Sequence, residues 1–127
     1  LDGAHNPQGA QTLARALEML GETPVTGVMG VLSDKDSAGA LDALAPRFRR
    51  LICVTPDNPR ALDAHELAAR ADVFGLQTSA AHSLEEGLFL AQAVAKSEQG
   101  AVVVCGSLYL AAQARKLLLK KEADGCG

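Results

Sequence analysis

Short apolar runs alternate along the chain with longer stretches in which apolar residues recur every three or four positions. The runs at 25–32, 51–54 and 101–105 predict strands. The first run is too short for a typical helix and fits a strand buried on both faces, and the second is also expected to be a buried strand. A weaker strand is expected at 76–79. The longer stretches predict helices at 7–20, 37–45, 63–72 and 83–97, and a last helix that begins at 106–107.

Capping and breaking residues support these helix limits. Asn6 suits an N-cap position, Pro7 suits the first position of a helix, and Pro46 ends the second helix. Ser83-x-x-Glu86 has the form of a capping box. The inner face of the second helix is expected to consist of Ala38, Leu41, Leu44 and Ala45, and that of the last helix of Leu110, Ala114, Leu117 and Leu118.

Strands that alternate with helices predict an α/β fold. The expected architecture is an open, mainly parallel sheet with helices on both faces, and a length of 127 residues is that of a single domain. One further strand is expected before Asp2, and only Leu1 of it is present. Because the chain starts with Leu rather than Met, we expect a piece of a longer protein, with residues 122–127 as a frayed tail.

Composition narrows the range of partners. The net charge is −3 without a basic patch, and aromatic residues make up only 3% of the chain, which argues against nucleic acids and membrane surfaces. Cys53, Cys105 and Cys126 are odd in number and lack metal-ligand spacing, so they indicate reduced thiols in the cytoplasm. No apolar run approaches the roughly 18–20 residues that span a bilayer.

Four polar loops are predicted at one edge of the sheet, beyond the carboxyl ends of the strands, where open parallel sheets bind ligands. They cover 2–6, 33–36, 55–60 and 106–107. The candidate side chains on them are Asp2, His5, Asp34, Lys35, Asp36, Arg60 and Ser107. Each also has a purely structural interpretation, because 33–36 can be a solvated turn, Arg60 can hold its own loop and Ser107 can cap a helix.

The loop at 2–6 is the strongest candidate site. Backbone N–H groups and the helix dipole at its end can hold a carboxylate or a phosphate, while Asp2 and His5 contact a second group. The same spacing also suits an ordinary strand-to-helix turn with Asn6 as its cap. The chain has no phosphate loop, no dinucleotide fingerprint and no nucleophile elbow, so we expect no complete nucleotide-triphosphate site within it.

The segment Asp-Gly-Ala-His-Asn-Pro at 2–7 resembles the motif that opens the C-terminal domain of folylpolyglutamate synthase / dihydrofolate synthase, in the Mur ligase superfamily. Three later segments agree with this family in order: Gly-Val-Leu-Ser-Asp-Lys-Asp at 30–36, Thr-Pro-Asp-Asn-Pro-Arg-Ala-Leu at 55–62 and Gly-Ser-Leu-Tyr-Leu at 106–110. The resemblance therefore covers nearly the whole chain.

The resemblance implies a Rossmann-like C-terminal domain of a cytoplasmic ATP-dependent ligase. In this family ATP phosphorylates a carboxylate of dihydropteroate or of a folyl-glutamate, and the amine of L-glutamate attacks the acyl phosphate. ATP and Mg²⁺ are bound mainly by a preceding domain of the same polypeptide, so the phosphate loop and the metal ligands are expected outside this chain. The domain by itself is expected to be inactive.

The family's site residues transfer to three positions of this sequence. Asp2 is similar to the aspartate that contacts the ribose or adenine side of the nucleotide. His5 is similar to the catalytic histidine of the same cleft, which orders glutamate or the phosphate. Ser107 resembles the position from which related ligases hold the carboxylate of the incoming amino acid. The resemblance assigns no role to Lys35 or Arg60.

A second interpretation is a free-standing regulatory or nucleotide-binding module of receiver or flavodoxin type. Asp34 and Asp36 at a strand end favour it, whereas the only other acid at a strand end, Asp57, is flanked by prolines. Uptake of phosphate by Asp57 from a small phosphodonor would support this alternative. A different Mur-type ligase would share the fold and differ in its substrate.

Overall fold

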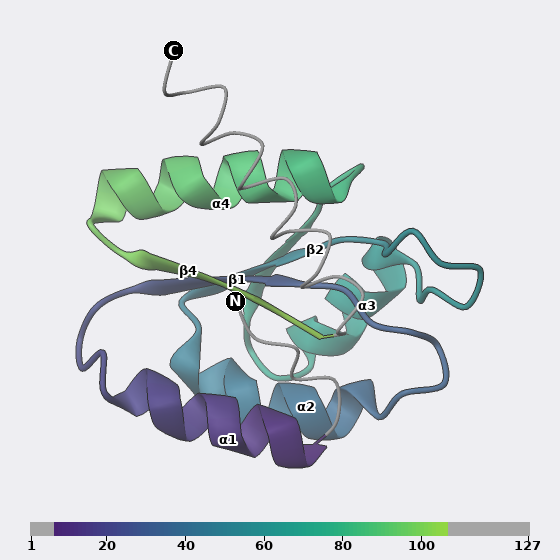
Figure 1. Ribbon diagram of the computed structural model, residues 1–127, viewed down its shortest axis with the longest axis horizontal. Helices are drawn as coiled ribbons and strands as arrows, with labels where there is room; N and C mark the ends of the chain where they lie inside the picture. Colours follow the sequence, from purple (N-terminus) through teal and green to yellow (C-terminus); the bar gives the residue numbers. More distant parts are fainter. Residues whose placement is uncertain (1–6, 107–127) are drawn as a thin grey trace.

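The structure is a computed structural model that describes residues 7–106. Its four strands form one open sheet in the order β3-β2-β1-β4 (Figure 1). All three strand pairings are parallel, so the carboxyl ends of the strands lie at one edge of the sheet. The strands are β1 (Val25–Met29), β2 (Arg50–Cys53), β3 (Gln77–Ala80) and β4 (Ala101–Cys105).

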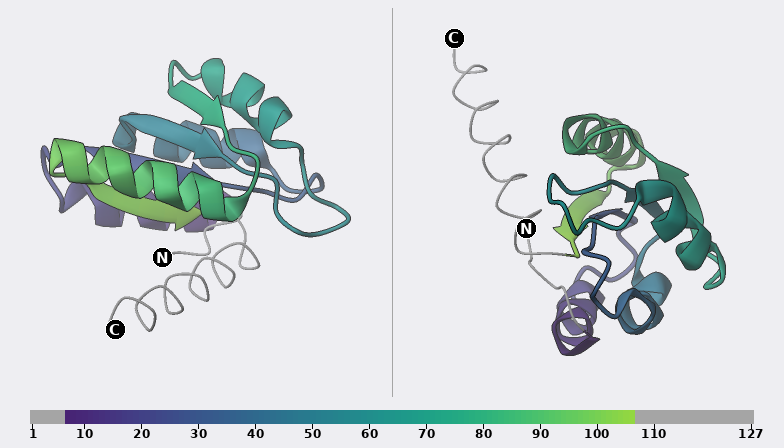
Figure 2. Two further views of the ribbon diagram at one scale, coloured as in Figure 1. Left: turned by 90° about the horizontal axis from the view of Figure 1, so that it is seen from above. Right: turned by 90° about the vertical axis from the view of Figure 1, so that its right-hand side faces the viewer.

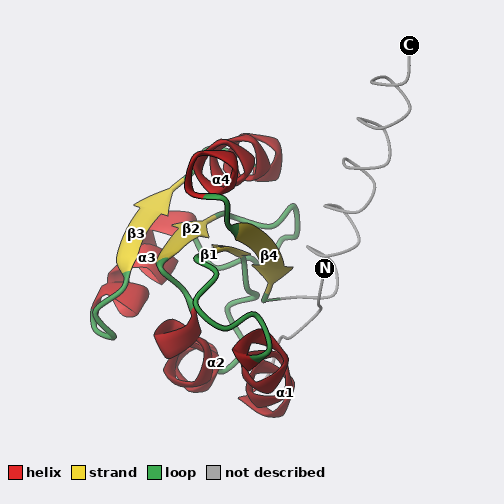
Figure 3. Cartoon of the chain, turned by 90° about the vertical axis from the view of Figure 1, so that its left-hand side faces the viewer, coloured by secondary structure: helices red, strands yellow, loops and turns green. Residues whose placement is uncertain are grey.

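Helices cover the sheet unevenly. Three of them pack on one face and α4 packs on the other (Figure 3). The helices are α1 (Pro7–Glu18), α2 (Ser37–Leu44), α3 (Ala64–Asp72) and α4 (Leu84–Glu98), and a 3₁₀ turn, η1 (Ala45–Arg47), follows α2. The predicted fold class, an α/β fold with a parallel sheet, is therefore confirmed, and Pro46 lies in the turn that ends the second helix, as predicted.

The core consists of two apolar clusters, one on each face of the sheet. Alternate residues of β2 serve the two clusters, since Leu51 faces α1–α3 and Ile52 faces α4. The cluster under α4 also contains Val28, Leu88 and Val104. The strands β1 and β2 are thus buried on both faces, as their short apolar runs predict.

The first strand is shorter than predicted. It ends at Met29 rather than at 32, because the chain turns away at Gly30 and Leu32 then pairs with Ala61 in an isolated antiparallel bridge. Val31 and Leu32 are nevertheless buried, which explains why their apolar character extended the predicted strand. No helix within residues 7–106 combines the length and apolar character needed to cross a bilayer.

Some predicted elements lie outside the described residues. They are the strand before Asp2, the last helix and the tail at 122–127. The first described helix starts at Pro7 as predicted, and the last described strand ends at Cys105 as predicted. The described part therefore begins directly after the predicted ligand loop at 2–6 and ends at Gly106, the first residue of the loop at 106–107.

Candidate functional site

Two glycines bring the ends of β1 and β4 together at the carboxyl edge of the sheet. Gly106 has φ +113°, and a Cβ atom there would lie 2.2 Å from the carbonyl oxygen of Gly30. Gly30 is in turn confined on its other side, where a Cβ atom would lie 3.0 Å from both the Val54 carbonyl oxygen and Pro56 Cγ. Only glycine fits both positions without a shift of the backbone. Three strand ends therefore meet at one point of this edge.

The loops at 33–36 and 55–60 also meet, as the sequence predicts. The Ser33 N–H donates to the carbonyl oxygen of Arg60 at 2.7 Å, and the Leu62 N–H donates to the carbonyl oxygen of Val31 at 2.9 Å. The Arg60 guanidinium pairs with the Asp34 carboxylate at 3.1 Å. Backbone and side-chain contacts thus join two loops that are more than twenty residues apart in the sequence.

The polar side chains of these two loops also have structural roles. Asp36 caps α2 by accepting a hydrogen bond from the Gly39 N–H, and Asn58 accepts one from the Arg60 N–H, both at 2.9 Å. The Arg60 side chain is 64% exposed, so its pair with Asp34 contributes little to stability, of order 0–1 kcal/mol. Lys35 is exposed as well. The loops are therefore held mainly by backbone bonds, and their charged groups remain accessible.

The three predicted site residues Asp2, His5 and Ser107 lie outside the described residues, but their immediate neighbours lie at this edge. A short connection at 19–24 links α1 to β1, and α1 runs back along the sheet, so its first residue lies at the carboxyl edge (Figure 1). Pro7 follows directly on the loop at 2–6, and Gly106 directly precedes Ser107. Both ends of the described chain thus point to the edge at which the sequence predicts a site.

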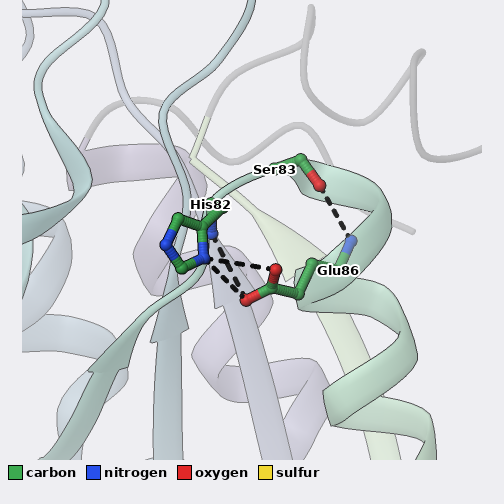
Figure 4. Close-up of polar contacts among 3 residues, drawn as sticks. All are labelled: His82, Ser83 and Glu86. Carbon is green, nitrogen blue, oxygen red and sulfur yellow. Dashed lines mark hydrogen bonds and ion pairs between the residues drawn. The ribbon is translucent and has the colours of Figure 1, made fainter.

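The loop after β3 completes the described part of the edge. Ser83 Oγ accepts a hydrogen bond from the Glu86 N–H at 3.1 Å, so Ser83 caps α4 as predicted (Figure 4). The Glu86 carboxylate lies 3.3 Å from Nδ1 of His82 and accepts the His82 N–H at 3.5 Å. His82 is a surface residue, as predicted, since its side chain is 92% exposed.

One group of charged side chains lies at the opposite edge of the sheet. Arg50, at the start of β2, pairs with Glu98, at the end of α4, and Arg49 lies 3.6 Å from the same carboxylate. Within residues 7–106 there is no group of three or more His, Cys, Asp and Glu side chains that could hold a metal ion.

Cys53 and Cys105 are buried thiols, as predicted from their apolar surroundings. Burial raises the pKa of the Cys53 thiol from 9.0 to about 12, with a further contribution from the charge of Asp72. The raised pKa keeps the thiol protonated at neutral pH, and a buried protonated thiol is a poor nucleophile. It belongs to the core rather than to a site.

Sequence reasoning missed the contact between Gly30 and Gly106. A signal for it exists, because Gly30 interrupts the apolar run at 25–32 and Gly106 directly follows the run at 101–105. Glycine at the carboxyl end of a parallel strand often marks a close approach of two backbones. Reading the two positions together would have predicted that the loops after β1 and β4 are neighbours.

Comparison with known proteins agrees with this geometry. The family model for the glutamate ligase domain of Mur ligases matches residues 1–108. Folylpolyglutamate synthase from Lacticaseibacillus casei is 36% identical over 120 residues, which are 94% of this chain and 26% of that protein. The chain thus spans about a quarter of the length of this relative.

Solved structures of folylpolyglutamate synthases are also similar to this chain. The Mycobacterium tuberculosis folylpolyglutamate synthase complexed with ADP is similar with a TM-score of 0.86 and 34% identity, over 92% of this chain and 29% of that one. The bifunctional folylpolyglutamate synthase/dihydrofolate synthase of Yersinia pestis, complexed with AMPPNP and a Mn ion, has a TM-score of 0.81 and 33% identity, over 93% of this chain and 28% of that one. The chain therefore belongs to the glutamate ligase domain family of the Mur ligases, the superfamily that its opening motif indicates.

Proposed function

We propose that this chain is the C-terminal domain of an ATP-dependent ligase that joins L-glutamate to dihydropteroate or to a folyl-glutamate. The acid would first be phosphorylated by ATP, and the glutamate amine would then displace phosphate from the acyl phosphate. The observation that carries the proposal is the similarity to a folylpolyglutamate synthase over 94% of the chain.

The edge of the sheet supports a role in closing a cleft. An acyl phosphate must be kept from water while an amine is held about 3 Å from the reactive carbon. A separate domain that closes over the cleft can do both. The carboxyl edge of this sheet suits that task, because it presents exposed polar groups such as Asp34, Lys35 and Arg60 on loops fixed by backbone contacts.

Three residues would carry the contacts. Asp2 would contact the ribose or adenine side of ATP, His5 would order glutamate or the transferred phosphate, and Ser107 would hold the glutamate carboxylate. Their sequence neighbours Pro7 and Gly106 lie at the carboxyl edge of the sheet, which supports this assignment. Since backbone N–H groups at a helix start favour anions, a carboxylate or phosphate is the chemistry expected beside such residues.

The nucleotide and the metal would be bound mainly by a preceding domain. Two similar structures contain ADP, or AMPPNP with a Mn ion, which supports ATP with a divalent cation as the cofactors of the whole enzyme. We assign Mg²⁺ as that cation, with its ligands outside this chain. The buried thiols of Cys53 and Cys105 fit a reducing cytoplasm.

The test uses the longer protein that contains this chain and measures glutamate-dependent release of ADP with dihydropteroate or a folyl-glutamate. Asp2→Ala should lower the rate roughly tenfold or more, because an oriented contact is lost. The matched control is Asp42→Ala, which removes an exposed aspartate of α2 and should leave the rate unchanged. Full activity of Asp2→Ala would remove Asp2 from its role, and a wild type without glutamate-dependent ADP release would overturn the proposal.

A further inference from the structure

Arg70, in the last turn of α3, forms a hydrogen bond with the first residue of α2. Its Nη1 donates to Ser37 Oγ at 2.9 Å, and its Nη2 donates to Glu66 Oε1, one turn back on α3, at 3.0 Å. The two helices lie side by side on one face of the sheet (Figures 2 and 3). Since side chains on a helix lean towards its start, the guanidinium of Arg70 is directed towards the carboxyl edge, where both helices begin.

The hydroxyl group of Ser37 is buried and needs this partner. The exposed fraction of Ser37 is 3%, and a buried hydroxyl without a hydrogen bond costs free energy. The start of α2 does not depend on this hydroxyl, because Asp36 already caps the helix by accepting the Gly39 N–H at 2.9 Å. The hydroxyl therefore contributes a contact with α3 rather than the cap of α2.

The loop between β1 and α2 is held at both of its ends by residues that follow β2. At its first end, the Ser33 N–H donates to the carbonyl oxygen of Arg60 at 2.7 Å. At its other end, Ser37 accepts the hydrogen bond from Arg70. Lys35 lies between these two contacts and is exposed. Loss of either contact should let the loop open more often.

This loop leaves the sheet next to the position that the proposed function assigns to glutamate. Gly106 directly precedes Ser107, and a Cβ atom on Gly106 would lie 2.2 Å from the carbonyl oxygen of Gly30. Gly30 is three residues before Ser33, the first residue of the loop. The exposed ammonium group of Lys35 has the charge that suits a carboxylate. The order of the loop should therefore affect the binding of glutamate.

We propose that Arg70 is a positioning residue for glutamate, because through Ser37 it holds the loop at 33–36 in the conformation that binds. The inference rests on the proposed function, since it requires that this edge of the sheet meets glutamate. Arg70 acts through the order of the loop and not by contact with a substrate. A loop that is ordered for only part of the time weakens substrate binding, whereas the complex, once formed, reacts at its normal rate.

Steady-state kinetics of glutamate-dependent ADP release by the longer protein that contains this chain test the proposal. Arg70→Met keeps the apolar stem of the side chain and removes its donors. It should raise the KM for L-glutamate about fivefold and leave kcat within about twofold. The matched control is Arg47→Met. Arg47 also pairs with a glutamate, and its side chain is 39% exposed against 41% for Arg70, but it lies in η1, beyond the far end of α2. Its replacement should change neither constant.

Ser37→Ala keeps the test decisive if Arg70→Met does not fold. It removes only the acceptor, so it should raise the KM for L-glutamate by the same factor as Arg70→Met, and the double variant should show no further rise. An unchanged KM for either single variant would overturn the proposal. Additive effects of the two changes, or the same rise in KM for Arg47→Met, would also contradict it.

Hydrogen exchange of the same proteins distinguishes this inference from the proposed function. In Arg70→Met and in Ser37→Ala, peptides that cover 33–39 should exchange at least about tenfold faster, because the backbone hydrogen bonds of Lys35 and Ser37 open more often. Arg47→Met should leave this exchange unchanged. Unchanged exchange in Arg70→Met would show that Arg70 does not hold the loop, whatever the activity of the wild type. A wild type without glutamate-dependent ADP release would instead overturn the proposed function, and the role of Arg70 for glutamate with it.

Discussion

At the scale of single residues, the Cys53 thiol links stability to pH. Its pKa is raised from 9.0 to about 12 in the folded chain, so its contribution is fully present below pH 9 and is lost as the pH rises towards 12. In that interval the free energy of unfolding should fall by about 1.4 kcal/mol per pH unit through this one group. Urea unfolding of the wild type and of Cys53→Ala, measured from pH 8 upwards, checks this.

Comparison with Cys53→Ala removes the effect of every other group that titrates, because both proteins contain those groups. Cys53→Ala creates a small cavity whose cost does not depend on pH, so the stability difference between the two proteins is constant below pH 9. Above pH 9 that difference should shrink. If that difference stays constant up to pH 11, the thiol has the same pKa in the folded and the unfolded chain, which would contradict the prediction.

Substitutions at two glycines with positive φ distinguish the cost of backbone strain from the cost of a steric collision. Gly21 has φ +62° and open space around it, so Gly21→Ala should cost about 1 kcal/mol of strain alone. Gly106→Ala adds a collision with the Gly30 carbonyl oxygen, because a Cβ atom would lie only 2.2 Å from it. We expect it to cost about 3 kcal/mol or more in denaturant unfolding. Equal costs for the two variants would show that the ends of β1 and β4 are not in contact.

At the scale of elements, the cap of α4 can be measured by itself. Ser83→Ala removes the acceptor of the Glu86 N–H and should cost about 1 kcal/mol. Ser97→Ala changes an exposed serine near the other end of the same helix and should be neutral or slightly stabilising. The midpoints of chemical denaturation compare the two variants. If both changes have the same effect, Ser83 does not cap the helix in solution.

The same elements show what sequence patterns can and cannot predict. Strands and capping residues were predictable because they depend on local chemistry, as at Ser83 or in the run of Ala101–Cys105. The inner face of α2 was only partly predicted, since Ala38 is exposed and Ala40 is buried. Alanine costs little on either face of a helix, so its position carries a weak signal.

The candidate site, too, could be predicted only in part from the sequence. The meeting of the loops at 33–36 and 55–60 was predicted, because parallel strands bring their carboxyl ends to one edge. The contact of Arg60 with Asp34, and that of Arg50 with Glu98 at the other edge, depend on side-chain reach across the fold. Local patterns contain no such information, and the assignments of Asp2, His5 and Ser107 remain predictions of the family resemblance.

At the scale of the whole molecule, the two apolar clusters should unfold in one cooperative transition, because they lie on opposite faces of the same sheet. Leu41 belongs to the cluster under α1–α3 and Leu88 to the cluster under α4, while β1 and β2 contribute to both. Leu41→Ala and Leu88→Ala should each cost about 2–4 kcal/mol and shift one common transition. Met19→Ala, at an 89% exposed position, should shift it hardly at all. Circular dichroism and exchange of the β1 amides follow the transition independently, and a variant that moves only one of the two signals would show that the faces unfold separately.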